Sequence, residues 1–417
     1  MSELEKIDTY HFSETLIFDN IHGYIEIDEV AKSIIDTPEF QRMRRIHQDG
    51  ALHYVFPTAN HSRFEHSIGT YHLAKKMIST LRNKQPELKI TDRIVKVISL
   101  AGLCHDLGHL MYSHLFDDLF LSKLGNKDKL KKNNLNLYIH EDRSILILSN
   151  MIEMKNIKIS DDELDVIKDL IHPGKSYLED YEKWSEEFKV GKWIFQIVSN
   201  PKNSIDVDKF DYINRDNKAI GLKLDVDFSR LIMQARVIND EIFYPIQSKE
   251  NLYHLFFVRY QLHRRIYHHK TVKAIEILIV KILFELEKSH QISEYLLNYD
   301  KIQLLVDNFI FHTDNKNVKK LINDIETRNL PSLIYEKVSL TDDEVGVNYK
   351  DNDKETFYTI KYKVGYSSDS TNPLSKINFY KPKDKMVVED INVRNFSLLT
   401  NDNHQEFVTR IYSSTKI

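Results

Sequence analysis

Several side chains that bind metal ions or transfer protons lie close together in the segment HDLGHLMYSH, residues 105–114. A His-Asp pair alone is weak evidence, because a chain with 19 histidines contains such pairs by chance. The pair His105-Asp106 is more informative here, since it directly follows residues 94–104, an apolar run with the spacing of a buried helix. The polar side chains that come next are His109, Ser113 and His114. Imidazole and carboxylate groups at the end of a core helix predict a metal-binding or proton-transfer site.

A metal site needs further ligands from separate elements of the fold. One candidate is His66, at the start of an apolar periodic segment over residues 64–81. The others are Asp206 and Asp208, in the first turn of a helix over 204–218 that Asn203 or Ser204 would cap. These residues also have ordinary structural uses, because histidines pack or cap helices and acidic residues favour helix N-termini.

Two rows of side chains at four-residue spacing extend from this region. Asp208, Tyr212 and Asp216 share one helix face, and carboxylates there are unusual for a buried stripe. The second row belongs to an expected helix over 252–287, with Arg264 and Arg265 beside it, and comprises Arg259, His263, Tyr267 and Lys270. A basic helix face is usually only solvated. Interleaved with His and Tyr, however, it suits an anionic ligand that contains a ring.

The elements that position these residues are mainly helices. Apolar spacing predicts two packed core helices over 64–81 and 94–104, and further helices over 140–155 and 161–171. Residues 357–366 and 376–380 alternate apolar and polar side chains around a turn-rich stretch, as a hairpin does. We therefore predict a mainly α fold, with a helical catalytic core over 12–290 and a small α+β lobe over 291–417.

Composition excludes several classes of protein. The formal charge is −4, from 58 basic and 62 acidic residues, so no global basic field draws the chain onto nucleic acid or membrane. The chain has 11 glycines, against about 29 at an average usage of roughly 7%. No glycine-rich phosphate loop is present, so side chains and metal must hold any phosphates. A single cysteine and the absence of a long apolar segment predict a soluble intracellular protein, either cytoplasmic or nuclear.

The order His66, His105-Asp106, Asp208 resembles the signature of the HD-domain metal-dependent phosphohydrolases. Among them, the chain is most similar to the deoxynucleoside triphosphate triphosphohydrolases (dNTPases) of animals that join a SAM domain to an HD domain. The similarity covers about residues 12–415 and rests on ordered motifs, among them YVFPTANHSRFEHSIG, AGLCHDLGH, IDVDKFDYINRD and LHRRIYHHK. It implies an HD-domain helical core and a divalent cation, Mg, Mn, Fe or Zn. The ligands that it implies are His66, His105, Asp106 and Asp208.

The resemblance also implies roles for other residues. Those expected to touch phosphate or to transfer protons are His109, His114, Asp117 and His140. Those expected to bind the substrate are Gln48, Arg63, Lys209, Tyr212, Asp216, Arg259, His263 and Tyr267. Among them, Gln48 and Asp216 match contacts to the sugar 3'-hydroxyl, and Tyr212 matches the residue that excludes ribose. A regulatory guanine nucleotide, GTP or dGTP, is expected at Asp36, Gln41, Arg44, Arg230, His269 and Lys270.

Departures from the family pattern concern regulation and the sugar pocket. The 417 residues contain no SAM domain and end before the helix that helps the animal enzyme to form tetramers. Thr15 and Phe18 replace a lysine and an asparagine that bridge two regulatory nucleotides. Asp49 replaces a leucine beside the sugar, and His268 replaces a glutamine near the base. We expect dNTP substrates, a homo-oligomer (dimer or tetramer), weaker dependence on paired nucleotides, and single-stranded nucleic acid as a further candidate partner.

The expected reaction is hydrolysis of a dNTP at the α-phosphorus to deoxynucleoside and triphosphate. A cation bound by two imidazoles and two carboxylates would activate water, and His114, kept protonated by Asp117, would donate a proton to the 5'-oxygen. An HD phosphodiesterase or nuclease would use the same metal set, and a nucleotide sensor or single-strand binder without turnover remains a third interpretation. Tyr212, Gln48 and Asp216 favour a 2'-deoxy sugar with a 3'-hydroxyl over the second interpretation.

Overall fold

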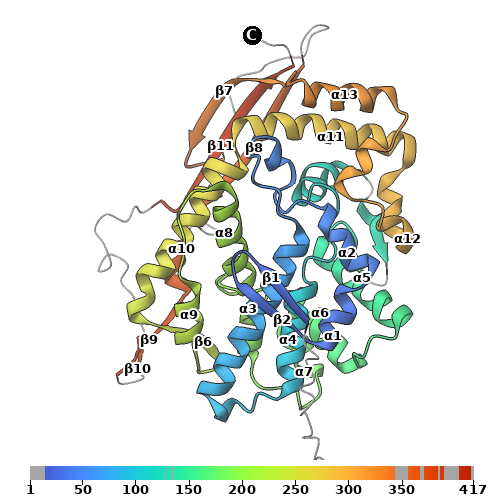
Figure 1. The fold of residues 1–417 in the computed structure, drawn as a ribbon. Coiled ribbons are helices and arrows are strands. Elements are labelled where there is room, and N and C mark those ends of the chain that lie inside the picture. The colour runs from blue at the N-terminus through green and yellow to red at the C-terminus, as the bar shows by residue number, and fades with distance from the viewer. Residues whose placement is uncertain are drawn as a thin grey trace, which may run out of the picture.

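The computed structural model describes residues 15–125, 127–132, 135–342, 356–366, 371–383, 386–388 and 403–414. The protein is mainly helical, with small sheets at its periphery (Figure 1). The longer helices are α3 (Arg63–Lys84), α4 (Asp92–Cys104), α5 (His140–Lys155), α6 (Asp161–Ile171), α8 (Val207–Ile220), α10 (Lys249–Gln261), α11 (Lys270–His290) and α13 (Lys316–Glu326). The shorter ones are α1 (Glu29–Ile35), α2 (Pro38–Gln41), α7 (Tyr177–Lys183), α9 (Phe228–Gln234) and α12 (Tyr299–Ile302).

The two predicted core helices are confirmed as α3 and α4, which pack against each other at the centre of the molecule (Figure 1). Ser62 and Glu65 form a capping box at the start of α3, and the Thr91 side chain caps α4. The apolar positions of both helices are buried in one core. The helices α5 and α6 also have the predicted bounds. These elements form the frame that carries His66 at one helix start and His105 at one helix end.

The helix α8 begins later than predicted. Its N-cap is Asp206, whose side chain accepts a hydrogen bond from the Lys209 backbone N–H at 3.1 Å, so the expected cap at Asn203 or Ser204 is wrong. A carboxylate at this position satisfies a free N–H group and interacts favourably with the helix dipole. Asp206 is thereby used in capping, and Asp208, in the first turn of the helix, remains as the candidate ligand.

The predicted continuous helix over 252–287 is also wrong. The structure has α10, then a π-helical turn over Leu262–Tyr267, and then α11, which His269 caps. Between them His268 leaves helical geometry, with φ −104° and ψ 27°. Apolar spacing runs through this region, which is why it was predicted as one helix. Wide turns of this type often occur at functional sites, and this one carries His263 and Tyr267.

The predicted C-terminal hairpin is wrong, because its two strands belong to different sheets. The strand β8 (Phe357–Gly365) pairs with β11 (Gln405–Ser413), which also pairs with β7 (Ser332–Ser339). The strand β9 (Asn378–Lys381) pairs in parallel with β6 (Glu241–Pro245) and antiparallel with β10 (Met386–Val388), and β5 (Arg236–Ile238) completes that sheet. Alternation identified β8 and β9 as strands, but it carries no information on which partner each one takes.

Two further strand pairs were not predicted from the sequence. The strands β1 (Thr15–Asp19) and β2 (Gly23–Ile27) form an antiparallel hairpin that lies across α3 in the view of Figure 1. Its outer side chains Leu16, Phe18 and Tyr24 are exposed. A short pair joins β3 (Lys131–Lys132) to β4 (Leu135–Asn136).

One hydrophobic core runs through the helices and reaches Leu374, Ile377 and Phe379 near the C-terminus. The sheet β10-β9-β6-β5 has strands from both sides of residue 290, and the domain boundary there stays a prediction. None of the helices in the described parts of the chain combines the length and the apolar character that a membrane crossing requires.

Candidate active site

Three helices bring the four predicted metal ligands together. His66 lies in the first turn of α3, His105 and Asp106 directly follow the end of α4, and Asp208 lies in the first turn of α8. The His66 Nε2 atom lies 3.2 Å from His105 Nε2, 3.0 Å from Asp208 Oδ1 and 3.5 Å from Asp106 Oδ2. The His105 Nε2 atom lies 3.4 Å from Asp106 Oδ1 and 3.6 Å from Asp208 Oδ1. The donor atoms of His66, His105 and Asp106 therefore lie within 4.8 Å of one another, and Asp208 approaches the two histidines from α8.

These spacings fit a divalent cation. Nitrogen and oxygen ligands bind zinc at about 2.0 to 2.2 Å, so neighbouring donors around one ion lie about 3.0 to 3.5 Å apart in octahedral or tetrahedral geometry. The observed separations of 3.0 to 3.6 Å match this requirement. Two imidazoles with two carboxylates suit Zn, Fe or Mn, and also Mg where water completes the coordination. The donor set therefore supports a metal site and leaves the metal open.

The electrostatics of the group agree with this assignment. Burial alone lowers the pKa of His66, but its hydrogen bonds to Asp208 and Asp211 outweigh burial and raise the pKa to about 10. Burial raises the pKa of Asp106, yet Arg63 and His105 hold it well below its usual range. The carboxylates are thus ionised, as metal ligands must be. A bound cation would replace the proton on His66, since a ligand imidazole is neutral.

Asp211 supports the metal ligands and was missed by sequence reasoning. Its Oδ2 accepts from His66 Nδ1 at 2.7 Å, and its Oδ1 lies 2.7 Å from His22 Nε2. Arg215 contacts both of its oxygens, at 2.8 and 3.0 Å, and also contacts Asp19 at 2.9 Å. Asp211 thus fixes the orientation of His66 so that Nε2 faces the other ligands. The signal in the sequence was the i,i+4 pair Asp211-Arg215.

Gly69 provides a sharp test of this supporting network. A Cβ atom at this position would lie 1.9 Å from Asp211 Oδ1 and 2.5 Å from the Arg215 guanidinium. We expect Gly69→Ala to displace Asp211 from His66 and to weaken metal affinity about 10- to 100-fold. Metal titration monitored by calorimetry measures this. Gly125→Ala is the matched control, because its Cβ would meet nothing; equal metal affinity in both variants would contradict the role of Asp211.

Cationic residues lie beside the metal ligands. Arg63 is buried and donates to Asp106 Oδ2 at 2.6 Å, to Ser113 Oγ at 3.0 Å and to the Gln48 carbonyl at 3.0 Å. The Lys209 ammonium lies 3.7 Å from Asp206, and Asp206 raises the Lys209 pKa above its usual value although burial alone lowers it. Arg259 donates to the Gly365 carbonyl at 2.9 Å. Of these cations, Arg63 contacts a candidate metal ligand directly, and positively charged side chains of this kind suit a polyanion.

Three histidines form a second group next to the metal ligands. The rings of His109 and His140 stack with centroids 4.0 Å apart, and His114 meets both rings edge to face. His109 is fully buried and its Nε2 lies 3.3 Å from Asp106 Oδ1, yet neither of its ring nitrogens makes a hydrogen bond within the described residues. The surrounding protein, together with the positive charge of Arg63 and His140, lowers the His114 pKa, although the His114 side chain is exposed. The ring nitrogens of His109 are therefore available to a ligand, whereas His140 Nδ1 lies 3.2 Å from the Glu141 carboxylate.

The expectation that Asp117 keeps His114 protonated is wrong. Asp117 instead accepts from the Arg143 guanidinium at 2.6 and 2.8 Å and lies 3.6 Å from His140 Nδ1. A buried guanidinium is the stronger partner, because it delivers two charge-assisted hydrogen bonds. Asp117 therefore acts on His140 and on Arg143, and the pKa of His114 is lowered instead of raised.

Two buried arginines hold the turn that follows His105-Asp106. Arg143 donates to the Gly108 and Leu137 carbonyls, each at 2.8 Å. Arg42 donates to the His109 carbonyl at 2.8 Å and also to the Leu107 carbonyl. Burial, together with repulsion from Arg143, lowers the Arg42 pKa to about 9. Sequence reasoning missed both residues, because a single arginine in a helix or loop gives no sign that it is buried.

A separate polar group lies at the other end of α8, where the predicted sugar contacts are. The Asp216 oxygens accept from His61 Nε2 at 2.8 Å and from the Tyr267 hydroxyl. Asp49 Oδ2 lies 3.4 Å from His61 Nε2. The ring of His263 meets that of Tyr267 edge to face, at 5.0 Å. The hydrogen bond between Tyr267 and Asp216 thus connects the two rows of side chains that were predicted from their four-residue spacing.

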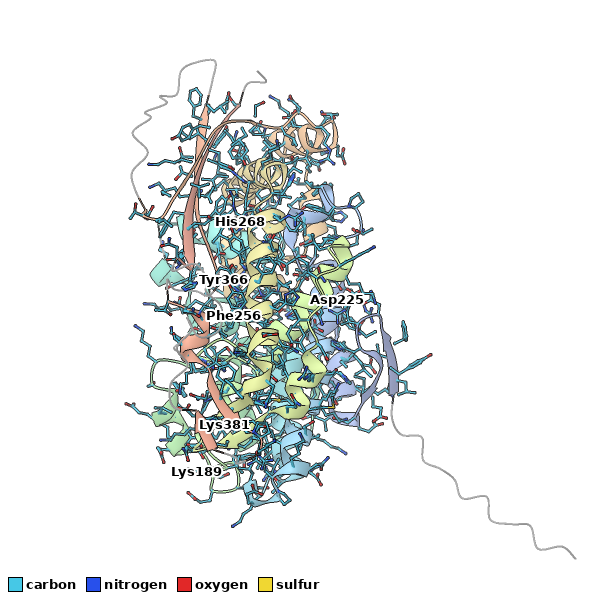
Figure 2. All side chains as sticks on the ribbon, turned by 90° about the vertical axis from the view of Figure 1, so that its left-hand side faces the viewer. Lys189, Asp225, Phe256, His268, Tyr366 and Lys381 are labelled. Carbon is cyan, nitrogen blue, oxygen red and sulfur yellow. The ribbon has the colours of Figure 1, made fainter. Side chains whose placement is uncertain are left out.

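C-terminal strands fix the segment between α10 and α11. Arg410 on β11 donates to the His268 carbonyl, and the Tyr412 hydroxyl donates to the Lys270 carbonyl at 3.0 Å. His268 stacks on Tyr362 of β8 with ring centroids 4.0 Å apart. Figure 2 shows His268 above Tyr366 and Phe256, where the C-terminal strands run beside the yellow helices. The strands β8 and β11 therefore position the turn that carries Tyr267.

The predicted regulatory residues occupy several surface elements. Gln41 accepts from Arg44 Nε at 2.8 Å, and Arg44 lies over the Phe64 ring, while Asp36 is exposed nearby at the end of α1. Arg230 is exposed on α9. His269 and Lys270 lie at the start of α11, where the His269 ring meets Phe56. The structure therefore brings Asp36, Gln41 and Arg44 into one region, and leaves Arg230 on α9 and His269 and Lys270 together at the start of α11.

Known proteins resemble this chain over most of its length. A Dictyostelium discoideum protein described as a deoxynucleoside triphosphate triphosphohydrolase SAMHD1 homolog is 34% identical over 97% of the chain and 78% of its own length. A putative HD domain-containing protein of Acanthamoeba polyphaga mimivirus is 32% identical over 94% of the chain and 91% of its own length. Human SAMHD1 is 36% identical over 76% of the chain and 54% of its own length. No protein-family model matches the sequence. The chain covers 78% and 91% of the Dictyostelium and mimivirus relatives, and His66, His105 and Asp106 form a group that could hold a metal ion, so the chain belongs to the SAMHD1-like family of HD-domain phosphohydrolases.

Proposed function

We propose that this protein hydrolyses deoxynucleoside triphosphates at the α-phosphorus, giving a deoxynucleoside and inorganic triphosphate. The observation that supports this most is that the candidate metal ligands lie beside the buried Arg63 guanidinium and the three-histidine group, with a separate polar group further along α8. A triphosphate suits the cationic end and a sugar suits the other end. The relatives described as deoxynucleoside triphosphate triphosphohydrolases support the same substrate class.

A divalent cation held by His66, His105, Asp106 and Asp208 would lower the pKa of water and polarise the phosphoryl oxygen. The residues of the chain bind and orient the substrate around this point. Arg63, Lys209 and Arg259 would bind the phosphate oxygens and stabilise charge that develops on them.

Cleavage of the phosphorus–oxygen bond requires a proton for the 5'-oxygen. His114 is our candidate donor, with His109 and His140 beside it. The surrounding protein and nearby positive charge lower its pKa in the free protein. A bound triphosphate adds negative charge beside this imidazole and so favours its protonated form. The substrate itself would thus bring the general acid into its active state.

The direct test incubates the purified protein with each dNTP and with Mg²⁺ or Mn²⁺, and measures inorganic triphosphate and deoxynucleoside. Equal molar release of both products supports the proposal. Release of monophosphate or pyrophosphate would instead indicate a phosphodiesterase or pyrophosphatase. Nucleotide binding without any product would indicate a sensor.

Tyr212 is proposed to exclude ribose, because its ring lies on the α8 face between Asp208 and Asp216. We expect the wild-type protein to cleave dATP far faster than ATP. Tyr212→Ala should reduce this preference by about 10- to 200-fold, since a steric pocket rejects by only a few kcal/mol. Steady-state rates on both nucleotides measure the ratio, and equal wild-type rates would contradict the assignment.

We further propose that assembly depends less on paired nucleotides than in the animal relatives. Thr15 cannot neutralise two facing triphosphates, and the Phe18 side chain is 67% exposed and apolar. We expect an oligomer that forms without nucleotide or responds to GTP alone. Light scattering with and without GTP and dNTP, alongside turnover, measures this. Conversion from inactive small species to an active tetramer only with both nucleotides would contradict it.

A further inference from the structure

The polar group at the far end of α8 contains more than the family pattern predicts. We define it as the Asp49 cluster: Asp49, His61, Asp216 and Tyr267. Asp216 lies eight residues after Asp208 on one helix face, which at 1.5 Å per residue is about 12 Å along the axis. The cluster is therefore distinct from the metal ligands. Its residues come from separate segments, which the fold brings together at one place.

Two buried atoms of the cluster, the carboxylate oxygen Asp49 Oδ2 and the imidazole nitrogen His61 Nδ1, have no hydrogen-bond partner within the described residues. Both oxygens of Asp216 are used, by His61 and by the Tyr267 hydroxyl. Asp49 Oδ2 lies near the same His61 nitrogen at 3.4 Å but makes no hydrogen bond within the described residues. The Asp49 side chain is nine-tenths buried, with a relative exposure of 10%. A buried carboxylate oxygen without a donor is unfavourable unless a ligand supplies one.

The charge of the cluster selects the kind of ligand. Burial alone lowers the His61 pKa, but Asp216 and Asp49 outweigh it and raise it to about 10, so this histidine carries a positive charge. Two carboxylates around one imidazolium leave the cluster acidic near neutral pH. An acidic cluster repels phosphate and accepts hydrogen bonds from neutral donors. The uncharged sugar end of a nucleotide, with its hydroxyl donor, meets this requirement.

We propose that Asp49 is a specificity-determining residue that accepts a hydrogen bond from the 3'-hydroxyl of the substrate sugar, with His61 holding its carboxylate in place. This inference rests on the proposed function and adds Asp49 and His61 to the contacts at that hydroxyl. The pocket should therefore discriminate strongly against nucleotides whose 3'-hydroxyl is absent. A nucleotide without it leaves the Asp49 oxygen buried and unpaired, and such sites reject analogues more strongly than steric pockets do.

The test measures binding, so that it does not depend on turnover. The probes are two dATP analogues in which a methylene group replaces the 5'-oxygen and prevents hydrolysis, one with and one without the 3'-hydroxyl. Calorimetry on the metal-loaded wild-type protein should show about 10- to 100-fold tighter binding of the hydroxyl analogue. Asp49→Leu and Asp49→Asn should bind the analogue with the 3'-hydroxyl more weakly than the wild type does. Their affinity for the analogue without it should be unchanged. The ratio of the two affinities should therefore fall in both variants.

Asp92→Asn is the matched control, because this acid is fully exposed and remote, and it should keep the wild-type ratio. Equal binding of both analogues to the wild type, or an unchanged ratio in both Asp49 variants, would overturn the proposal. The proposal would also be overturned if the wild type bound a second metal ion that the Asp49 variants lose, with the ratio of analogue affinities unchanged. The cluster would then be a cation site. Preference for the hydroxyl analogue without triphosphate release from any dNTP would refute the proposed function and leave this subsite standing. Triphosphate release without a preference for the hydroxyl analogue would support the proposed function and refute the proposed role of Asp49.

Discussion

Asp208→Ala should abolish turnover and leave a folded protein. The carboxylate lies 3.0 Å from His66 Nε2 and 3.6 Å from His105 Nε2, so its removal takes away one of four converging donors. Loss of a residue that only orients a ligand costs about 10- to 100-fold in metal affinity or activity. Loss of the ligand itself should exceed this by several powers of ten. Triphosphate release and metal content, measured on the same preparation, test the expectation.

Asp208 is a cleaner choice than Asp106 for this experiment. Asp208 has a side-chain exposure of 32%, so alanine there leaves no closed cavity. Removing Asp106 would leave the Arg63 guanidinium buried without its 2.6 Å partner, and the protein would lose stability as well as metal. Asp92→Ala is the control for a surface carboxylate. Wild-type turnover in Asp208→Ala, with a wild-type melting curve, would remove Asp208 from the site.

The sequence predicted those parts of the fold that depend on local spacing. The bounds of α5 and α6, and the positions of α3 and α4, follow from apolar periodicity and caps. The failures concern long-range partners. Alternation in β8 could not show that its partner is β11, and the continuous periodicity over 252–287 concealed the π-helical turn.

For the candidate site, too, the sequence predicted what depends on local pattern and missed what depends on partners distant in the chain. Its metal ligands were predicted because their residue types and order are distinctive, and the structure places them together. Asp211, Arg42 and Arg143 were missed, since their importance depends on burial and on partners that no spacing reveals. Asp117 was assigned to His114, one turn away, whereas its partner Arg143 lies 26 residues later. The sequence shows only which residues are close along the chain. In the folded protein the guanidinium of Arg143, which is distant in sequence, is the stronger partner of Asp117.

Arg143→Leu should therefore cause one of the largest losses of stability in the protein. The Arg143 side chain is fully buried, and its guanidinium binds Asp117 and the carbonyls of Gly108 and Leu137. Leucine would leave a buried carboxylate and two carbonyls without these partners. Breaking a buried ion pair by removing one member costs about 3 to 5 kcal/mol, which is a large share of the roughly 5 to 15 kcal/mol that stabilises a typical domain.

A double-mutant cycle separates the ion pair from the carbonyl contacts. Asp117→Asn in the Arg143→Leu background removes the stranded charge, so the double variant should regain part of the lost unfolding free energy. Arg82→Leu is the control, since its partner Asp92 is fully exposed and the change should fall within about 0.5 kcal/mol. Urea denaturation of five proteins gives the unfolding free energies: the wild type, Arg143→Leu, Asp117→Asn, the double variant and Arg82→Leu. If Arg143→Leu unfolds like Arg82→Leu, the turn after His105-Asp106 is held by other contacts. If it unfolds early and Asp117→Asn restores nothing, the carbonyl hydrogen bonds, and not the charge pair, account for the stability of this turn.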